Sequence, residues 1–323
     1  MIKTAMNMLK STVPQSSAGT PDRSDIVGYL AVLLAAACWG TSGIFVRFVS
    51  VSSEITALAL AFWRDLFSFV VLLAGVGLFR PGGLRVQRRD LPWLLGFGGS
   101  LGVFHVFWNL GVMLNGPAVA TVQQAAMPAI VTVVAWLIWR EPLTWNKALA
   151  IVLTFAGTVL VSDLDALGQA KVSLSGLLVG LGIPLTYAAW TLFGKKVREH
   201  YGPMESLAFG FGVGALVLLP FQFFTPQPWP VPMVSWLWFA GLIFVSTAFA
   251  FSMYAIGLGR LPASVASILA MTEIPIVAVY AYVLLDEMMS ADQILGAILV
   301  IGGVLLLSRR RRQAAHESEV VER

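Results

Sequence analysis

The chain has 323 residues, of which 58% are hydrophobic and only 12% are charged, and its net charge is +4 at pH 7. Soluble domains carry about 25% charged residues, so this chain lacks the polar surface of a water-soluble globule. The single cysteine, Cys38, excludes an intramolecular disulfide framework. The small positive charge lies in loops between apolar runs and requires no nucleic-acid partner. These features indicate a membrane protein that crosses the bilayer several times.

The chain starts with a polar segment, 1–25, which is expected to be a disordered cytoplasmic tail, and it ends with a basic cytoplasmic tail, 309–323. Between them lie apolar runs of roughly 18–25 residues, the length at which a helix crosses a bilayer. The sequence therefore predicts an all-α membrane protein with ten transmembrane helices. The expected spans are 27–46, 55–79, 92–114, 117–139, 145–162, 174–194, 203–224, 233–257, 262–285 and 291–308.

Two helix starts have local signals. Thr144 and Ser290 have the residue type and position of N-caps, and Ser290 with Gln293 has the pattern of a capping box. These signals place the beginnings of the fifth and tenth spans.

The positions of Lys and Arg predict the orientation. With the N-terminus in the cytoplasm, eighteen of the 21 Lys and Arg residues fall in cytoplasmic segments, whereas Arg47 and Lys171 fall outside and Arg64 lies within a span. Cytoplasmic loops of membrane proteins carry an excess of Lys and Arg. We therefore expect both termini in the cytoplasm.

The chain contains an internal repeat. "GYLAVLLAAACWGTSGIFVRFV" matches "GLLVGLGIPLTYAAWTLFGKKV", which places Trp39 opposite Tyr187. "WREPLTWNKALAIVLTFAGTVLVS" matches "LDEMMSADQILGAILVIGGVLLLS", which places Glu141 opposite Glu287. The repeats, 27–162 and 173–308, hold five spans each. Because five is odd, the second must enter the membrane from the opposite side, which predicts two inverted five-helix repeats around a central cavity.

Several motifs resemble the EamA family of the drug/metabolite transporter superfamily. They are "CWGTSGIFVRF", the mid-span arginine of "FWRDLF", "YAIGLGRLPASVASILAMTEIP" ahead of "LLDE", and the paired endings "AGTVLVS" and "GGVLLLS". The resemblance covers roughly 30–162 and 176–307. It implies the same ten-helix architecture, transport without ATP or another cofactor, and export of small metabolites, amino acids among them, across the bacterial inner membrane. Either a monomer or a weak homodimer is expected.

Polar and aromatic side chains near mid-depth identify the candidate site, because charged groups inside a bilayer are costly, at about 2.5–3.5 kcal/mol, and usually face a cavity or a partner. The fifth and tenth spans carry almost none and are expected at the periphery. The candidate substrate-binding residues are Trp39, Arg64, His105, Asn109, Gln123, Tyr187, Trp190 and Glu273.

Arg64 and its neighbour Asp65 are expected to make different contacts. The Arg64 guanidinium can bind a substrate carboxylate through two hydrogen bonds; alternatively it is locked to Glu273 or caps backbone carbonyls. Asp65 is expected to point elsewhere, because neighbours along a helix do not face the same way.

Glu273 breaks the repeat symmetry, since its counterpart is about Met127. It precedes Pro275, which opens the helix as Pro128 does in the fourth span. Glu273 is the first candidate for a proton carrier and His105 the second, and a structural role for either remains open. Asn109 lies one turn after His105 and is expected on the same face.

Two pairs of residues related by the repeat have further interpretations. Trp39 and Tyr187 either sandwich an apolar, aromatic or cationic substrate group or serve helix packing. Glu141 and Glu287 are read as structural groups near the N-termini of the fifth and tenth helices, where the helix dipole favours them.

The main alternative is an enzyme. Gly40-Thr41-Ser42-Gly43 and the H-x-x-x-N pattern of His105 and Asn109 are similar to motifs of rhomboid intramembrane proteases. A serine nucleophile needs a base within hydrogen-bond reach, and no further deep histidine remains for that role. Neither a phosphate-binding loop nor clustered Cys and His for a metal is present. The interpretation is therefore a non-enzymatic secondary transporter of a small amphipathic metabolite, with protons as a further ligand. A protease using Ser42 and a non-transporting scaffold are the alternatives.

Overall fold

The structure is a computed structural model that describes residues 23–53, 55–79, 85–115, 117–162, 174–285 and 290–321. These residues form helices joined by turns and short loops, with no β-strand among them, which confirms the predicted all-α class. Most of the expected tail, 1–25, lies outside the described residues, and its last three residues begin the first helix.

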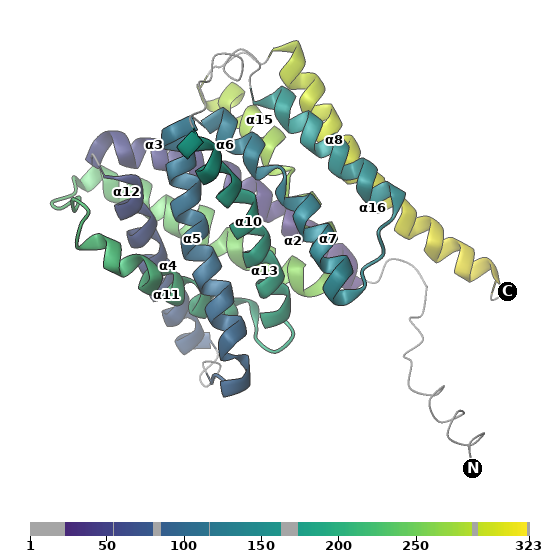
Figure 1. Cartoon of the computed structure of the whole chain (residues 1–323), viewed down its shortest axis with the longest axis horizontal. Helices are drawn as coiled ribbons and strands as arrows, with labels where there is room; N and C mark the ends of the chain where they lie inside the picture. Colours follow the sequence, from purple (N-terminus) through teal and green to yellow (C-terminus); the bar gives the residue numbers. More distant parts are fainter. Residues whose placement is uncertain are drawn as a thin grey trace.

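The helices follow the order of the expected spans (Figure 1). The first half of the chain forms α2 (Arg23–Gly40), α3 (Ser42–Ser53), α4 (Ala57–Phe79), the 3-10 helix η1 (Arg88–Asp90), α5 (Leu91–Asn115), α6 (Pro117–Gln124), α7 (Met127–Trp139) and α8 (Trp145–Val161). The second half forms α10 (Leu174–Val197), α11 (Pro203–Gln222), α12 (Met233–Ile243), the π-helix η2 (Phe244–Phe249), α13 (Ala250–Arg260), α14 (Ala263–Ala270), α15 (Glu273–Leu285) and α16 (Ala291–Val321).

Eight helical segments in the described part of the chain are long and apolar enough to cross a membrane. They coincide with the first four expected spans and with the sixth to ninth. The fifth and tenth expected spans are shorter apolar helices, Trp145–Val161 and Ala291–Leu307. The chain is therefore a multi-pass membrane protein, and every expected span is helical.

Two spans are broken where proline predicts a break. α6 and α7 meet just ahead of Pro128, and α14 and α15 meet just ahead of Pro275. Proline removes a backbone N–H and its ring clashes with the preceding turn, so the helix is interrupted. The first span is also broken, at Thr41, and the eighth contains the π-helix η2.

The expected N-caps are confirmed. Thr144 Oγ1 accepts a hydrogen bond from the Lys147 N–H at 3.3 Å. Ser290 and Gln293 form the reciprocal capping box, with N–H to side-chain oxygen distances of 3.2 and 2.9 Å. These caps satisfy backbone donors that a helix start otherwise leaves open.

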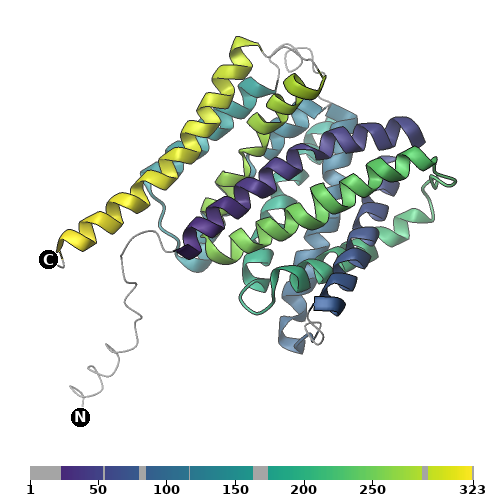
Figure 2. The ribbon, with the colours of Figure 1, turned by 180° about the vertical axis from the view of Figure 1, so that it is seen from behind.

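α8 and α16 pack along each other at one edge of the bundle, as both views show (Figures 1 and 2). They approach closely at two glycines: a Cβ on Gly157 would lie 2.6 Å from the Gly296 carbonyl oxygen, and a Cβ on Gly296 would lie 2.6 Å from the Gly157 carbonyl oxygen. Small residues permit such contacts between membrane helices. The prediction that the fifth and tenth spans lie at the periphery is confirmed.

The basic residues gather at one end of the bundle, which we call the basic end. Lys195 Nζ donates to the carbonyl oxygens of Leu258 at 2.9 Å and Leu261 at 2.7 Å, which joins the end of α10 to the end of α13. Tyr201 Oη donates to Asp90 Oδ2 at 3.0 Å, which brings the start of α5 to the same end. Burial raises the pKa of the Tyr201 hydroxyl and keeps it a donor. The basic end carries Arg85, Arg88, Arg89, Arg140, Lys147, Lys195, Lys196, Arg198 and Arg260.

Candidate functional site

A cluster of aromatic rings lies between α2, α10 and α13. The Trp39 ring centroid is 5.1 Å from that of Tyr254 and 5.2 Å from that of Phe251. Trp190 stacks on Tyr254 at 5.3 Å, and Tyr187 lies 5.5 Å from Trp190. All five side chains are buried. The structure thus brings together the predicted Trp39, Tyr187 and Trp190, and we call these five residues the aromatic cluster.

The rings of the aromatic cluster pack against one another where a central cavity was expected. The indole N–H groups of Trp39 and Trp190 are nevertheless buried without a hydrogen-bond partner in the described structure. Buried donors are normally satisfied, so these two are available to a ligand that separates the rings. A groove of about 520 Å³ lies elsewhere, between α4 and α11, and is lined by apolar side chains such as Leu66 and Leu216.

Phe251 and Tyr254 were missed in the sequence. Phe251 follows Thr247 by four residues and Tyr254 follows it by seven, so the three share one face of the eighth span. The span is apolar all round, and therefore this spacing did not stand out from ordinary packing residues.

Arg64 extends from α4 to the eighth span. Its Nε donates to Thr247 Oγ1 at 2.9 Å, and its Cζ lies 5.9 Å from the centre of the Phe251 ring. The side chain is half-buried, and no other hydrogen bond holds the guanidinium within the described structure. Its two terminal amino groups therefore remain free for a paired contact with a carboxylate.

The π-helix η2 positions the partner of Arg64. Thr247 Oγ1 donates to the carbonyl oxygen of Leu242, five residues earlier, at 2.7 Å. The adjacent Ser246 hydroxyl lies 2.8 Å from the Thr41 hydroxyl, at the break between α2 and α3. The irregular turns of the first and eighth spans are thus joined by side chains. Such π-helical turns occur frequently at functional sites.

Glu273 is the first residue of α15, directly after the break in the ninth span. It is half-buried and forms no ion pair with Arg64 in the described structure, although Arg64 and Tyr187 are near enough to interact with it electrostatically. The alternative in which Arg64 and Glu273 are locked together is therefore not seen. The N-terminal end of a helix favours a negative charge, which supports a carboxylate at this position.

Asn109 and Gln123 contact neighbouring helices. Asn109 Nδ2 donates to the Ala57 carbonyl oxygen at 2.8 Å, which ties α5 to the first turn of α4. A Cβ at Gly180 would lie 2.0 Å from Gln123 Nε2, so the Gln123 side chain occupies the space above the α10 backbone. Both side chains are half-buried. Asn109 serves as a link between helices in this structure, and nothing places either residue in the aromatic cluster.

Asp65 points away from Arg64, as expected, and meets His105. Asp65 is 0% exposed and His105 is 2% exposed. His105 Nδ1 lies 2.8 Å from Asp65 Oδ1, although the angle is not that of a hydrogen bond. His105 and Asn109 both face α4, which confirms that they share one helix face. The sequence did not identify this pairing, because the rotation of α4 against α5 is set by packing.

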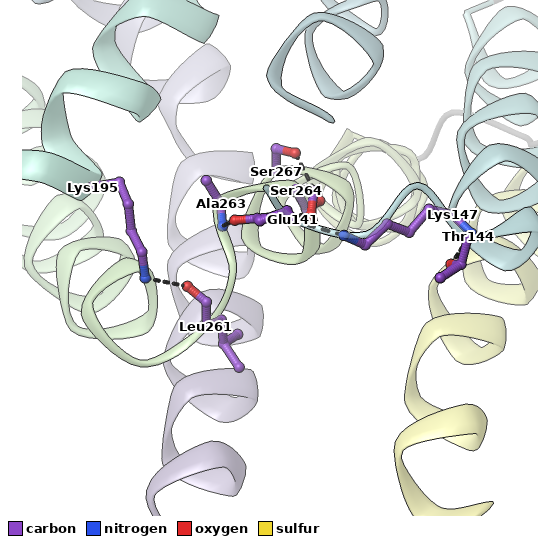
Figure 3. A network of polar contacts seen from close by, with 8 residues as sticks. All are labelled: Glu141, Thr144, Lys147, Lys195, Leu261, Ala263, Ser264 and Ser267. Carbon is purple, nitrogen blue, oxygen red and sulfur yellow. Dashed lines mark hydrogen bonds and ion pairs between the residues drawn. The ribbon is translucent and has the colours of Figure 1, made fainter. Parts of the chain in front are cut away.

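At the basic end, Glu141 joins the two halves of the chain (Figure 3). One carboxylate oxygen accepts from the Ala263 N–H at 3.0 Å, the other accepts from the Ser264 hydroxyl, and Lys147 Nζ lies 3.5 Å away. Glu141 therefore caps α14. The expectation of a structural role near the start of the fifth helix agrees with the contact to Lys147 in the first turn of α8. The contacts to Ala263 and Ser264 in the second half were not predicted. Glu287 lies outside the described residues.

The protease motif is not assembled into a nucleophile and base. Ser42 begins α3 and forms no hydrogen bond to His105, whose ring is paired with Asp65. His200 lies at the basic end, 3.8 Å from Asp90. A catalytic serine requires its base within hydrogen-bond reach, so the described geometry does not support this alternative.

Secondary transporters hold their substrates in an arrangement of this kind, with apolar helices interrupted near mid-length and charged and aromatic groups buried between two halves of the chain. The comparisons agree with this class. The EamA-like transporter family matches residues 26–163 and 174–309, so that two copies of the family domain cover most of the chain. The protein therefore belongs to the EamA-like transporter family.

Individual relatives are also transporters. The inner membrane transporter YicL of Salmonella typhimurium, whose function is uncharacterized, is 29% identical over 300 residues, which are 89% of this chain and 98% of that protein. An uncharacterized transporter of Archaeoglobus fulgidus is 27% identical over 270 residues, 82% of this chain and 91% of its own. The S-adenosylmethionine uptake transporter of Rickettsia prowazekii is 22% identical over 276 residues, 83% of this chain and 89% of its own.

One crystal structure shares the fold. It has a TM-score of 0.74 and 21% sequence identity, and the match covers 90% of this chain and 98% of the other. At this identity the likeness concerns the fold alone.

Proposed function

We propose that the protein is a secondary transporter that exports a small amphipathic metabolite, an amino acid or a related compound, by alternating access. The observation that carries the proposal is the pair of opposite charges formed by Arg64 of the first half and Glu273 of the second, beside the aromatic cluster. The terminal amino groups of Arg64 take the substrate carboxylate. Glu273 takes the ammonium group, and the rings of Trp39 and Trp190 take the apolar part.

Alternating access requires two related halves, and the helix pairing supports them. α2 packs on α13, and α5 packs on α10, so the first span meets the eighth as the third meets the sixth. α4 packs on α11 and α8 packs on α16, which pairs equivalent helices of the two halves. A two-fold axis between five-helix repeats, 27–162 and 173–308, produces this pattern. Because each repeat has an odd number of spans, the axis lies in the membrane plane.

The membrane orientation is part of the proposal. The basic end gathers the Lys and Arg residues that the positive-inside rule assigns to the cytoplasm. We therefore place the basic end and both termini on the cytoplasmic side of the inner membrane.

The fifth span is part of the ten-span proposal. α8 has 17 residues, and at about 1.5 Å per residue its length of about 26 Å nearly matches a hydrocarbon core of about 30 Å.

A substrate that carries both a carboxylate and an ammonium group also agrees with the substrate of one relative. The Rickettsia relative takes up S-adenosylmethionine, a compound that carries an amino acid head group. The paired charges of Arg64 and Glu273 suit such a head group whatever is attached to it. Export, rather than uptake, rests on the resemblance of the sequence motifs to exporters.

Counterflow in proteoliposomes tests the substrate class. Vesicles loaded with unlabelled amino acids are placed in tritiated amino acids, their deaminated acids or their decarboxylated amines. The amino acids are expected to exchange, and the two kinds of analogue to bind at least about tenfold more weakly, because each loses a charged contact of about 1.5–3 kcal/mol. Exchange of either analogue as fast as the amino acids would reject the Arg64 and Glu273 assignment. No exchange of any amino acid would reject the substrate class.

A further inference from the structure

The Asp65 and His105 side chains form a buried polar site apart from the aromatic cluster. Both carboxylate oxygens of Asp65, both ring nitrogens of His105 and the Ser68 hydroxyl are buried without a hydrogen-bond partner in the described structure. Ser68 follows Asp65 by three residues and is 0% exposed, so it lies on the same face of α4. Asp65 Oδ1 and His105 Nδ1 lie 2.8 Å apart, and the pair has no other hydrogen-bond partner in the described structure. Such a buried pair is unusual, because buried polar groups are normally satisfied by hydrogen bonds.

The walls of this site are apolar and tightly closed. The Phe211 ring of α11 lies 6.4 Å from the His105 ring, and the Phe251 ring of α13 lies 6.3 Å from it. A Cβ on Gly214 of α11 would lie 2.9 Å from Asp65 Oδ2. Glycine at 214 therefore makes the room that the carboxylate occupies.

One fixed charge is near this site. Arg64, the neighbour of Asp65, interacts with it electrostatically. Several helices pack against α4 or α5. Three of them contribute no titratable side chain, namely α6, α12 and η2. α11 carries Glu205 in its first turn, α10 carries Tyr187, Lys195 and Lys196, and η1 carries Arg88, Arg89 and Asp90. α13, whose Phe251 ring faces His105, carries Tyr254 and Arg260. Of these, Tyr187 and Tyr254 belong to the aromatic cluster, and Asp90, Lys195 and Arg260 lie at the basic end.

We propose that Asp65 and His105 together form the proton-binding site that couples substrate movement to a proton gradient. With one proton the pair is neutral overall, as an imidazolium beside a carboxylate or as an imidazole beside a carboxylic acid. Without it the pair carries one negative charge, which a closed apolar site disfavours. The proton is therefore retained while the site is closed, and it leaves to water on one side or enters from the other only when the helices separate.

Phe251 connects this proton site to the substrate residues. Its ring contacts His105 on one side, the Arg64 guanidinium at 5.9 Å, and Trp39 at 5.2 Å. A ligand that enters the aromatic cluster and moves this ring also uncovers His105. Substrate binding and proton access are thereby linked through one side chain and through the shared turn of Arg64 and Asp65.

This inference rests on the proposed transport function and changes one expectation from the sequence. Glu273 was the first candidate for the proton carrier. It is half-buried and lies near Arg64 and Tyr187, where it suits the substrate ammonium. Asp65 and His105 are enclosed and unpaired with other groups, and so they suit a proton.

The test measures substrate and proton movement together. Proteoliposomes contain the pH dye pyranine and are supplied with a tritiated mixture of the protein amino acids. The wild-type protein is expected to move protons with the amino acids, and a pH difference of one unit is expected to change the accumulated amount by up to about tenfold for one coupled proton. Asp65→Asn and His105→Gln are expected to retain amino acid counterflow but to lose proton movement and the response to the pH difference.

Asp90→Asn is the matched control, because Asp90 is a carboxylate that is 5% exposed, at the basic end, and its replacement is expected to leave proton movement unchanged. Size-exclusion chromatography shows whether Asp65→Asn or His105→Gln fails to fold. If one of them fails, the result of the other tests the proton site. Proton movement by a folded Asp65→Asn or His105→Gln protein at the wild-type rate would overturn the inference. Wild-type counterflow without proton movement would also overturn it and leave the transport proposal standing. No wild-type counterflow would instead reject the proposed function.

Discussion

Arg64 and Asp65 are adjacent in the sequence, yet they serve different surroundings. Successive helical residues point in directions about a quarter-turn or more apart, and here one side chain meets Thr247 and the other meets His105. The sequence identifies both residues because charges at mid-depth are costly. It does not identify their partners, because these depend on how α4 is rotated against α5 and the eighth span.

Arg64→Lys tests the role of the guanidinium. Lysine keeps the positive charge but offers a single ammonium group, which does not make the paired contact with a carboxylate. We expect the concentration for half-maximal amino acid counterflow to rise at least about tenfold, which corresponds to about 1.4 kcal/mol.

Arg89→Lys is the control for that measurement, because the Arg89 side chain is 68% exposed at the basic end, and we expect no change there. An Arg64→Lys protein with the wild-type half-maximal concentration would contradict a carboxylate contact at this residue.

Glu141 shows how one side chain can join two halves of a chain. Its carboxylate accepts hydrogen bonds from Ala263 and Ser264, and it is paired with Lys147. Glu141→Gln keeps the size but removes the charge, and it leaves Lys147 without its partner. Because a hydrogen bond to a charged group contributes about 1.5–3 kcal/mol, we expect the midpoint of thermal unfolding in detergent to fall by several degrees.

The surface pair of Lys196 and Glu199 provides the comparison for Glu141. Those side chains are 33% and 40% exposed, and exposed pairs contribute about 0–1 kcal/mol. Glu199→Gln is therefore expected to change the midpoint little. Equal midpoints for the Glu141 and Glu199 variants would show that the cap on α14 does not stabilise the fold.

The helical features that the sequence predicted are those determined by residues close together in the chain. Ten apolar runs, the caps at Thr144 and Ser290, and the breaks ahead of Pro128 and Pro275 all follow from residue types within a few positions. The break at Thr41 and the π-helix η2 were not predicted. They are joined by the Thr41 and Ser246 hydroxyls, which are 205 positions apart in the chain, so no local pattern marks them.

The contact between α8 and α16 can be tested at its glycines. Gly157→Ala places a methyl group 2.6 Å from the Gly296 carbonyl oxygen, so the helices must move apart, and overpacking of this kind costs about 1–3 kcal/mol. We expect a lower midpoint of thermal unfolding. Gly302→Ala, where nothing lies within 4 Å of the added Cβ, is expected to be neutral or slightly stabilising. A Gly157→Ala protein as stable as the Gly302→Ala protein would contradict this packing.

The whole bundle gives the reason for the proposed mechanism. Its most extensive helix contacts, such as α8 with α16 and α5 with α10, join one half of the chain to the other, so the halves share a long interface. That interface holds Arg64, Glu273 and the aromatic cluster, and its basic end is joined by Glu141. The duplication was readable in the sequence, whereas the filled aromatic cluster was not, because the closing of a cavity depends on side-chain packing in one conformation.

Alternating access makes one demand that a scaffold or a protease does not: a mid-membrane position must be reached from each side of the membrane. Glu273→Cys in a Cys38→Ala background tests it with a membrane-impermeant thiol reagent, applied to right-side-out and to inside-out vesicles. We predict that the thiol reacts with the reagent in both vesicle orientations, because some molecules of the resting protein are open to each side. Reaction from neither side, or from one side alone, would contradict the account.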